Sequence, residues 1–586
     1  MKSLLRLIPY LTKYKTTLLW GLVTVIVSNL FTVAMPWFIG EAIDELKRGL
    51  QSGSLQHTDL LRYSLLIVGF ALVGGIMLFL TRQTIIVVSR RIEYDLRNDF
   101  LAHIQKLPLS YFQNTPTGDL MAHATNDISA VRNVLGPGIM YPADTFMTFS
   151  LSLTLMFIKS WQLTLMTLIP LPLVSYAVYR LGKIIHSKFN DRQEQYSLLT
   201  TKAQENLSGA RVVKAYVREE FEIEQFQKVS REYYKKNIVL AKAQSIMWPL
   251  MYVLVGLSLV IAVYFGGVKV INNEISIGTL TAFFTYLSLL IWPMIAFGWV
   301  TNMVQQGAAS MTRLAKIFDT VPEICNTEMT DHSITSINGE IEFKNVSFTF
   351  AKASQPTLKN INITIPRGNV LAIVGYTGSG KSSLVNLLPR LFDVTDGELL
   401  IDGINIKKIP LEVLRKHIGY IPQETFLFSD SIAENIRYGH DDAYRELIYE
   451  AAEISQISKD VADFPQRFET MLGERGITLS GGQKQRTSIA RAILRRPKIL
   501  ILDDALSAVD TYTEEAILQK LRGVMDGRTS IIISHRISTV KGADHIIVLD
   551  KGEIVEQGDH DALVEFGGIY SGLYEKQLLE KELEEL

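Results

Sequence analysis

The stretch that decides the fold is residues 369–382, which read NVLAIVGYTGSGKS. Its first six residues predict a short buried strand, and the rest fits GxxxxGK[ST], the phosphate-binding loop between a strand and a helix. Glycines let backbone N–H groups close around phosphates, and the N-terminus of the following helix adds partial positive charge. We expect Lys381 to reach the β- and γ-phosphates of a nucleotide and the Ser382 hydroxyl to ligate Mg²⁺. The residues predicted to bind the nucleotide here are Gly375, Tyr376, Thr377, Gly378, Ser379, Gly380, Lys381, Ser382 and Ser383.

A second motif argues against a glycine-rich loop that arose by chance. Residues 499–503, ILILD, form an apolar strand that ends in a carboxylate. Asp503 is suited to holding a metal through its water shell, and Asp504 stands where a base would polarise the attacking water. A role for Asp503 as a simple strand-end cap does not account for the phosphate loop.

A third motif gives a family resemblance. Residues 479–483, LSGGQ, precede Asp503 and resemble the signature motif of ATP-binding cassette proteins. The resemblance covers the whole chain and implies a bacterial half-transporter of the exporter type, similar to the multidrug-resistance-like group. It also implies that the signature faces the ATP bound by a second cassette. The residues assigned to the partner's ATP are Leu479, Ser480, Gly481, Gly482, Gln483 and Asp510.

The same resemblance assigns roles to residues outside the phosphate loop. Gln423 would be the Q-loop residue that contacts the metal and couples to the membrane domain, and His535 would be the switch histidine. Phe350 stands where the family stacks an aromatic ring on adenine, and residues 473–476 resemble a segment that contacts cytoplasmic helices. Each has a plainer alternative: a surface glutamine, a strand-end histidine, a core phenylalanine and, for Ser480, an ordinary helix N-cap.

Two positions depart from the family pattern. Tyr376 replaces a frequent proline, which should alter little because the backbone binds the phosphates. Asp504 stands where a hydrolytically competent exporter has glutamate. Its carboxylate lies roughly 1.5 Å further from the water, and a misplacement of about 1 Å can cost about 10²-fold in rate. This substitution resembles the weak-site chain of a heterodimeric exporter, although a homodimer remains open.

The first half of the chain predicts six membrane spans, because each needs about 20 apolar residues. Uncharged runs of this length, repeated in series, disfavour the alternative of buried helices in a large soluble protein. Asp144 is the one formal charge within them, which suggests a cavity-facing residue or a helix-packing contact. The runs are 16–40, 63–81, 133–158, 160–179, 243–268 and 275–306.

The flanks of the spans predict their orientation. Basic residues precede the first span, which places the N-terminus and the following nucleotide domain in the cytoplasm of a bacterial inner membrane. The two long connections on that side read as helices, with breaks at residues 116–119 and 208–209. We expect short helices at these breaks to touch a cytoplasmic domain.

Composition sets further limits. Lys plus Arg is 59 and Asp plus Glu is 60, a balance that disfavours a nucleic-acid binder. Cys325 is the single cysteine, so an internal disulfide is excluded. The mean hydropathy of +0.17 is high for a soluble chain and fits an apolar half joined to an ordinary one.

These observations predict an all-α membrane domain of six helices with long cytoplasmic extensions, followed by an α/β P-loop domain. The expected divisions are a membrane domain at 1–320, a linker at 321–338, a cassette at 339–575 and a charged tail at 576–586. The expected function is ATP- and Mg²⁺-dependent export of small apolar or amphipathic compounds by a dimer in the lipid bilayer. An ATP-gated channel or regulatory subunit is the alternative; an importer usually has its two domain types on separate chains.

Overall fold

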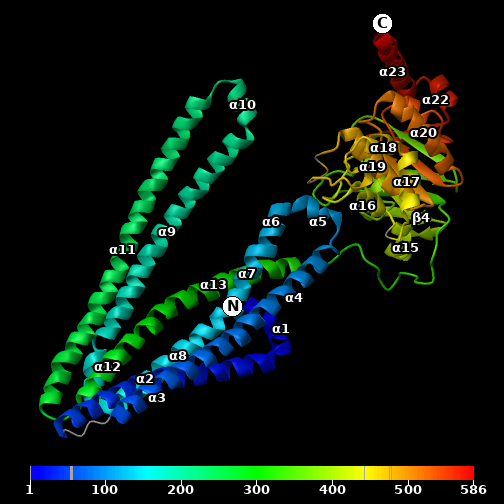
Figure 1. Cartoon of the computed structure of the whole chain (residues 1–586). Coiled ribbons are helices and arrows are strands. Elements are labelled where there is room, and N and C mark those ends of the chain that lie inside the picture. Colours follow the sequence, from blue (N-terminus) through cyan, green and yellow to red (C-terminus); the bar gives the residue numbers. More distant parts are fainter. Residues whose placement is uncertain (1, 53–56, 441, 474–475, 477, 586) are drawn as a thin grey trace. The chain divides into compact units, whose positions relative to one another are not determined.

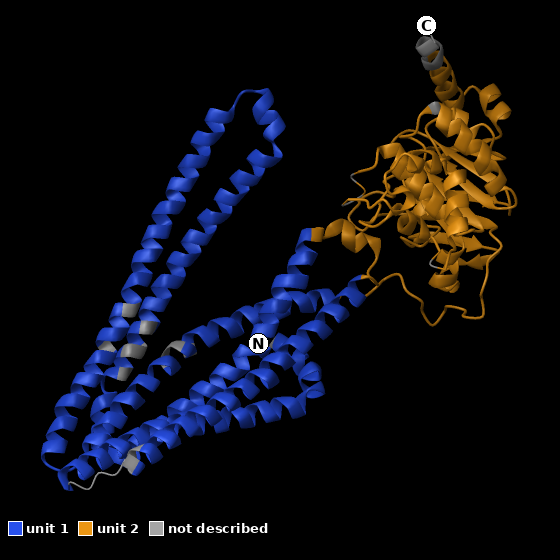
Figure 2. Ribbon diagram, viewed as in Figure 1, with its two compact units in different colours: residues 1–104, 118–319 blue, residues 105–117, 320–586 orange. Residues whose placement is uncertain are grey.

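The chain folds into two compact units, each of which is made of two separate stretches of the sequence. The computed structural model describes residues 2–52, 57–440, 442–473, 476 and 478–585. Unit 1 contains Met1–Ile104 and Gly118–Asp319, and unit 2 contains Gln105–Thr117 and Thr320–Leu586 (Figure 2). Within the segment at 473–476, Glu474 and Arg475 lie outside the described residues.

Unit 1 is helical throughout its described part (Figure 1). A 3₁₀ turn, Lys2–Leu7, precedes the first helix, and π-helical turns at Arg82–Ile86 and His123–Asp127 interrupt two longer runs. The helices are α1 Ile8–Lys13, α2 Lys15–Ser52, α3 His57–Thr81, α4 Val87–Ile104, α6 Thr117–Ala122, α7 Ile128–Leu135, α8 Pro137–Leu168, α9 Pro170–Ser208, α10 Ala210–Ala215, α11 Glu219–Ile271, α12 Ile277–Leu289 and α13 Ile291–Phe318.

Five helical runs among the described residues are long and apolar enough to cross a membrane: Lys15–Ser52, Leu61–Ile104, Thr117–Leu168, Glu219–Ile271 and Ile277–Phe318. The sequence predicted six spans, and the difference concerns the fourth, 160–179, which the structure divides between the end of α8 at Leu168 and the start of α9 at Pro170. A kink at Ser160 marks where this predicted span begins. This residue has non-helical angles, φ −165° and ψ 103°, inside α8. The kink lies between the predicted spans 133–158 and 160–179, so α8 joins the third span to the start of the fourth. The predicted all-α membrane domain is therefore confirmed.

The two predicted cytoplasmic connections are helical and break near their middles. In one, α9 ends at Ser208, and α10 makes the turn into α11. Figure 1 shows α9 and α11 running side by side below this turn, and the two helices make extensive contact. In the other, the short helix α5, Leu109–Asn114, lies between α4 and α6 and belongs to unit 2.

Unit 2 is an α/β domain with two sheets. Its strands are β1 Ile341–Phe348, β2 Leu358–Ile365, β3 Val370–Val374, β4 Asp396–Ile401, β5 Ile404–Asn405, β6 Ile418–Ile421, β7 Ile499–Asp503, β8 Thr529–Ile533, β9 His545–Asp550 and β10 Glu553–Gly558. Its helices after α5 are α14 Lys381–Asn386, α15 Leu411–Lys416, α16 Ile432–Arg437, α17 Arg445–Ile454, α18 Ile457–Ala462, α19 Gly481–Leu494, α20 Thr511–Met525, α21 Ile537–Val540, α22 His560–Phe566 and α23 Ile569–Glu585. Short 3₁₀ turns lie at Ile406–Lys408 and Arg467–Glu469.

The order of the strands positions the site. One sheet is antiparallel, with order β2-β1-β4-β5, and the other has order β10-β9-β3-β8-β7-β6. In the second sheet β3, β8 and β7 are parallel neighbours, with Ile533 opposite both Ile373 and Asp503. The carboxyl ends of these three strands therefore meet at one edge of the sheet. Every residue of β7 and β8 is buried, as expected for strands covered on both faces.

Helix packing in unit 1 depends on small residues where α2 meets α12. A Cβ added to Gly278 would lie 1.9 Å from the Gly40 carbonyl oxygen, so the backbones touch directly. Asp44 fixes the same crossing, because its carboxylate accepts hydrogen bonds from the Gly278 N–H at 2.8 Å and from the Ser276 hydroxyl. Close approach through small residues and interhelical hydrogen bonds are the usual means of association in a bilayer.

We predict that Gly278→Ala destabilises the protein by about 1–3 kcal/mol, because the added methyl group overpacks this crossing. Gly267→Ala is the matched control, since a Cβ at Gly267 in α11 meets nothing within 4 Å. The measurement is the midpoint of thermal unfolding of the purified protein. Equal midpoints for the two variants would contradict the close contact between α2 and α12.

Candidate active site

The phosphate loop joins the buried strand β3 to α14. Gly375, Gly378 and Gly380 have φ values of +150°, +85° and +104°, a region that favours glycine. A Cβ at Gly375 would lie 2.2 Å from the Leu549 carbonyl oxygen, and one at Gly380 would lie 2.9 Å from the Leu358 side chain. Only glycine fits both positions, so the backbone makes a cradle that a side chain would fill.

Lys381 extends back over this loop. Its Nζ donates hydrogen bonds to the carbonyl oxygens of Gly375 and Tyr376, each at 2.8 Å. Burial lowers the pKa of Lys381, and the negative charges of Asp503 and Asp504 oppose that shift. A bound phosphate would add a further negative charge and offers this ammonium a stronger acceptor than a carbonyl.

Asp503 ends β7 at 2% exposure. Its Oδ1 accepts a hydrogen bond from the Ser382 hydroxyl at 3.0 Å. Burial raises the pKa of the Asp503 carboxyl, Asp504 adds to the rise, and Ser382 and Lys381 oppose it. A hydroxyl beside a buried carboxylate is the oxygen donor set that Mg²⁺ prefers when phosphates supply further ligands. The residues present therefore fit the ion.

Asp504 has a constrained backbone and a direct contact with His535. Its φ is +49°, in the left-handed region. Its N–H donates to the Ile533 carbonyl at 2.9 Å, and its own carbonyl accepts from the Ser507 hydroxyl at 3.0 Å. One carboxylate oxygen lies 2.8 Å from His535 Nδ1. Strained backbone geometry of this kind is concentrated at functional sites.

These groups surround one cavity of about 430 Å³. The strand order of the sheet brings them together from positions more than a hundred residues apart in the chain. The predicted site residues on its wall are Gly375, Thr377, Gly378, Gly380, Lys381, Ser382, Ser383, Gln423, Asp503, Asp504 and His535. Thr357 and Ile533 also line it and were not predicted.

Three predicted nucleotide-binding residues are not on this wall. Tyr376 is exposed, whereas Ser379 is buried and its hydroxyl has no partner among the described residues. Phe350 packs edge-on against Phe348 and Phe392, with ring centroids 4.7 and 5.3 Å away. This packing attaches the Phe350 ring to the core and leaves the side chain half-buried.

The signature residues do not line the cavity that contains Lys381. Ser480 caps α19 through a capping box: its hydroxyl accepts from Gln483 N–H, and Gln483 Oε1 accepts from Ser480 N–H at 2.9 Å. A Cβ at Gly482 would lie 2.8 Å from the Ala508 carbonyl oxygen. Asp510 caps α20 by accepting from Thr513 N–H at 2.9 Å, and these hydrogen bonds lower the pKa of its carboxyl. The signature residues thus cap and begin α19, and they lie outside the cavity formed with this chain's own phosphate loop.

Gln485 is a positioning residue that the sequence did not reveal. Although it lies on α19, its side chain is 5% exposed. Its Nε2 donates to the Ser507 hydroxyl at 3.0 Å, and its Oε1 accepts from Ala508 N–H at 3.0 Å. It therefore ties the signature helix to the segment after Asp504. A polar residue on the buried face of a predicted helix was the signal available in the sequence.

Comparisons with known proteins agree with this geometry. Residues 18–294 match the model of the ABC transporter transmembrane region, and residues 358–507 match that of the ABC transporter family. A probable multidrug resistance ABC transporter ATP-binding/permease protein, YheI of Bacillus subtilis, is 36% identical over 95% of each chain. An ATP-dependent lipid A-core flippase of Syntrophus aciditrophicus is 34% identical over 96% of this chain and 93% of the relative. A bacterial Atm1-family ABC exporter solved with ATP bound superposes with a TM-score of 0.78 at 26% identity, covering 96% of this chain and 98% of that one.

A helical membrane domain fused to a P-loop domain of this construction defines an ATP-hydrolysing membrane exporter. This chain belongs to the ABC transporter family, and its relatives include multidrug-resistance-like exporters. It is a half-transporter, a multi-pass membrane protein that binds ATP and works as a dimer.

We predict that Lys381→Ala removes most ATP binding at this chain's own site, because the phosphates lose their closest cation. One charged hydrogen bond contributes about 1.5–3 kcal/mol, so affinity should fall roughly 10- to 100-fold. Lys359→Ala is the control, since Lys359 pairs with Glu553 on the surface of the same domain. Affinity can be measured by titration with a fluorescent ATP analogue, and wild-type affinity in Lys381→Ala would overturn the role of this residue.

Proposed function

We propose that this chain is the weak-site subunit of a heterodimeric exporter of small apolar or amphipathic compounds. The main evidence for this proposal is the position of Asp504. It stands where an active cassette has the longer glutamate, and its carboxylate is already engaged with His535 at 2.8 Å. A carboxylate held by His535 and shorter by one methylene is poorly placed to polarise water in the cavity.

The backbone around Asp504 restricts compensation for the shorter side chain. Its N–H is bonded to β8 through Ile533, and its carbonyl is bonded to Ser507, which Gln485 holds in turn. Moving Asp504 towards the cavity by about 1.5 Å would break bonds on both sides, at about 0.5–1.5 kcal/mol for each. These contacts support slow hydrolysis at this site.

The signature motif of this chain supports a heterodimer, because in a dimer it would complete the ATP site of the partner. The signature residues Leu479 to Gln483 match the family pattern and form an ordered helix start, so they are suited to completing the site of a second cassette. A partner with glutamate at the position of Asp504 would then hydrolyse its own bound ATP rapidly, with this chain's signature residues completing the site. We assign ATP and Mg²⁺ at this chain's own site to the phosphate loop, Ser382, Asp503 and Gln423, with His535 facing the γ-phosphate.

The remaining assignments follow the same reasoning. We place the N-terminus and the cassette in the cytoplasm, with the protein in the bacterial inner membrane. The low charge of the spans supports an apolar or amphipathic cargo, and the relatives' names include multidrug resistance proteins and lipid A-core flippases. An ATP-gated channel differs in one measurable respect, because only a pump accumulates its substrate against a gradient in sealed vesicles.

We predict that this chain purified alone hydrolyses ATP slowly and that Asp504→Glu raises its rate roughly 10- to 100-fold, by moving the carboxylate towards the water. Asp526→Glu, an exposed substitution of the same kind in this domain, should leave the rate unchanged. With a glutamate-bearing partner the complex should be fast, and changing that partner glutamate to glutamine should abolish the gain. A homodimer that turns over several ATP per second, unaffected by Asp504→Asn, would refute the weak-site assignment.

Asp144 provides a test of the cargo. Its Oδ1 accepts a hydrogen bond from Asn29 Nδ2 at 2.8 Å, and Asn29 also accepts from the Thr148 hydroxyl. Asn29 is 3% exposed, whereas Asp144 is half-buried. The contact supports a helix-packing role for one oxygen of Asp144, and the partial exposure leaves the carboxylate accessible to a cation.

We predict that Asp144→Asn lowers transport of cationic compounds about tenfold relative to neutral compounds, the effect of losing about 1.4 kcal/mol of charge attraction. Asn29→Ala is the control, because it removes the packing contact and keeps the charge. Transport is measured in vesicles with a cationic dye and a neutral dye of similar size. Equal losses for both dyes in Asp144→Asn would show that Asp144 serves packing alone.

A further inference from the structure

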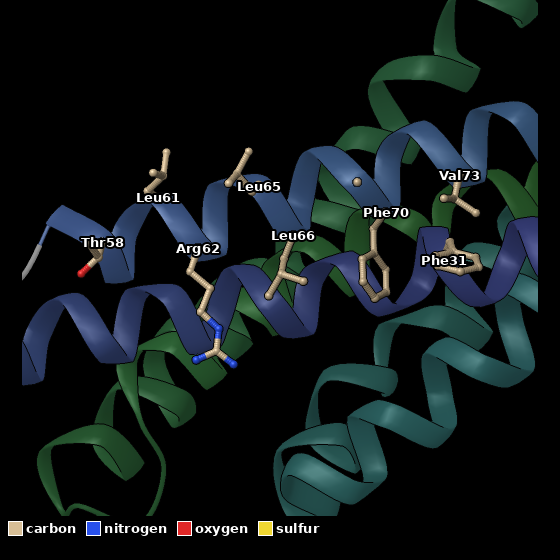
Figure 3. Close-up of a pocket in the computed structure, with 9 residues that line it drawn as sticks. Phe31, Thr58, Leu61, Arg62, Leu65, Leu66, Phe70 and Val73 are labelled. Carbon is tan, nitrogen blue, oxygen red and sulfur yellow. The ribbon is translucent and has the colours of Figure 1, made fainter.

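A groove runs along the surface of unit 1 between α2 and α3 and is separate from the nucleotide site. Its volume is about 630 Å³. Figure 3 shows Arg62, Leu66 and Phe70 projecting from α3 across α2, with Phe31 of α2 beside Phe70. The Phe31 and Phe70 rings pack edge-on with centroids 5.0 Å apart and close one wall.

The groove is apolar along its length and cationic at one end. Its lining is built of leucine, valine, phenylalanine and glycine except at Thr58 and Arg62. Gly69 keeps it open, because a Cβ at this position would meet nothing within 4 Å. Since successive lining residues recur at helical spacing on α3, the groove follows the helix axis.

The length of the groove matches one leaflet of a bilayer. Arg62 and Val73 are its charged and apolar ends on α3, and 11 residues of helix span about 16 Å. The hydrocarbon core of a bilayer is about 30 Å thick, so one leaflet accounts for about 15 Å. Arg62 directly precedes the predicted span 63–81, so this span would place it at the headgroup level of the leaflet opposite the α4 end of the run.

The guanidinium of Arg62 is exposed to its surroundings. No carboxylate among the described residues forms an ion pair with it. Other cations near the same ends of the spans are paired: Lys159 lies 2.8 Å from Glu41, and Arg48 lies 3.1 Å from Glu45. An arginine at the headgroup level attracts anionic lipid, and its planar guanidinium can donate two hydrogen bonds to a phosphate.

We infer that this groove binds one anionic phospholipid of the leaflet remote from the cassette. The phosphate lies on the Arg62 guanidinium. One acyl chain follows Leu66 and Phe70 as far as Val73 and fills the space beside Gly69. The charge selects the anionic headgroup, and the apolar wall supplies contact area that a lipid beside a flat helix face lacks.

The experiment measures lipid binding to the purified full-length dimer by native mass spectrometry in detergent. Phosphatidylglycerol and phosphatidylcholine with the same acyl chains are added separately. Gly69→Leu fills the groove, and Gly75→Leu is its matched control on the same helix, because a Cβ at Gly75 also meets nothing within 4 Å and Gly75 does not line the groove. Arg62→Gln removes the charge and keeps the groove.

We expect the wild-type protein and Gly75→Leu to bind phosphatidylglycerol about fivefold more tightly than phosphatidylcholine, the factor expected from one basic residue at an anionic surface. Arg62→Gln should abolish this preference, and Gly69→Leu should weaken both lipids. Equal binding of the two lipids to the wild-type protein would overturn the inference and leave Arg62 as a residue that reaches water. Lipid binding to Gly69→Leu that equals Gly75→Leu would also overturn it, as would loss of the dimer in Gly69→Leu alone, which would assign the groove to a subunit interface.

Discussion

The parallel pairing of β3, β8 and β7 is the constraint on which the rest of the catalytic unit depends. Ile533 lies opposite Ile373 on one side and Asp503 on the other, so the three strands end at the same level. A shift of one residue in this register would turn every side chain of a strand to the other face of the sheet. Lys381, Asp503, Asp504 and His535 reach one cavity because this register is fixed.

The site formed by this register has unbalanced electrostatics without its ligands. Asp503 is buried, and burial raises the pKa of its carboxyl, whereas burial lowers the pKa of Lys381. Both shifts disfavour the charged forms. Lys381 meanwhile donates to two carbonyl oxygens of its own loop. A Mg²⁺ ion beside Asp503 and phosphates beside Lys381 would restore favourable partners to both charges, so nucleotide binding stabilises groups that the fold alone leaves poorly compensated.

The membrane unit depends on a different kind of contact. Lipid tails are as apolar as leucine, so burial alone does not drive spans together, and close packing and polar contacts must do so. The Gly40–Gly278 contact and the bond from Gly278 to Asp44 hold α2 to α12, while Asn29 joins α2 to Asp144 of α8. The helices of unit 1 are thus joined through separate side-chain and backbone contacts, whereas the strands of the cassette are joined by continuous ladders of hydrogen bonds.

The sequence alone determined the class of each half and the residues of the phosphate loop, because hydropathy runs, strand ends and glycine spacing are local properties. It predicted six spans and a boundary near Ser160, where the structure has its kink. Only the tertiary structure decided that Asp504 is held by Ile533 and Ser507, that Gln485 joins two motifs, that Phe350 packs on Phe348 and Phe392, and that a groove opens beside Gly69. Each of these depends on side chains brought together by packing between separate elements. A local pattern of residues does not specify such distances, because the same pattern is compatible with many arrangements of its neighbours.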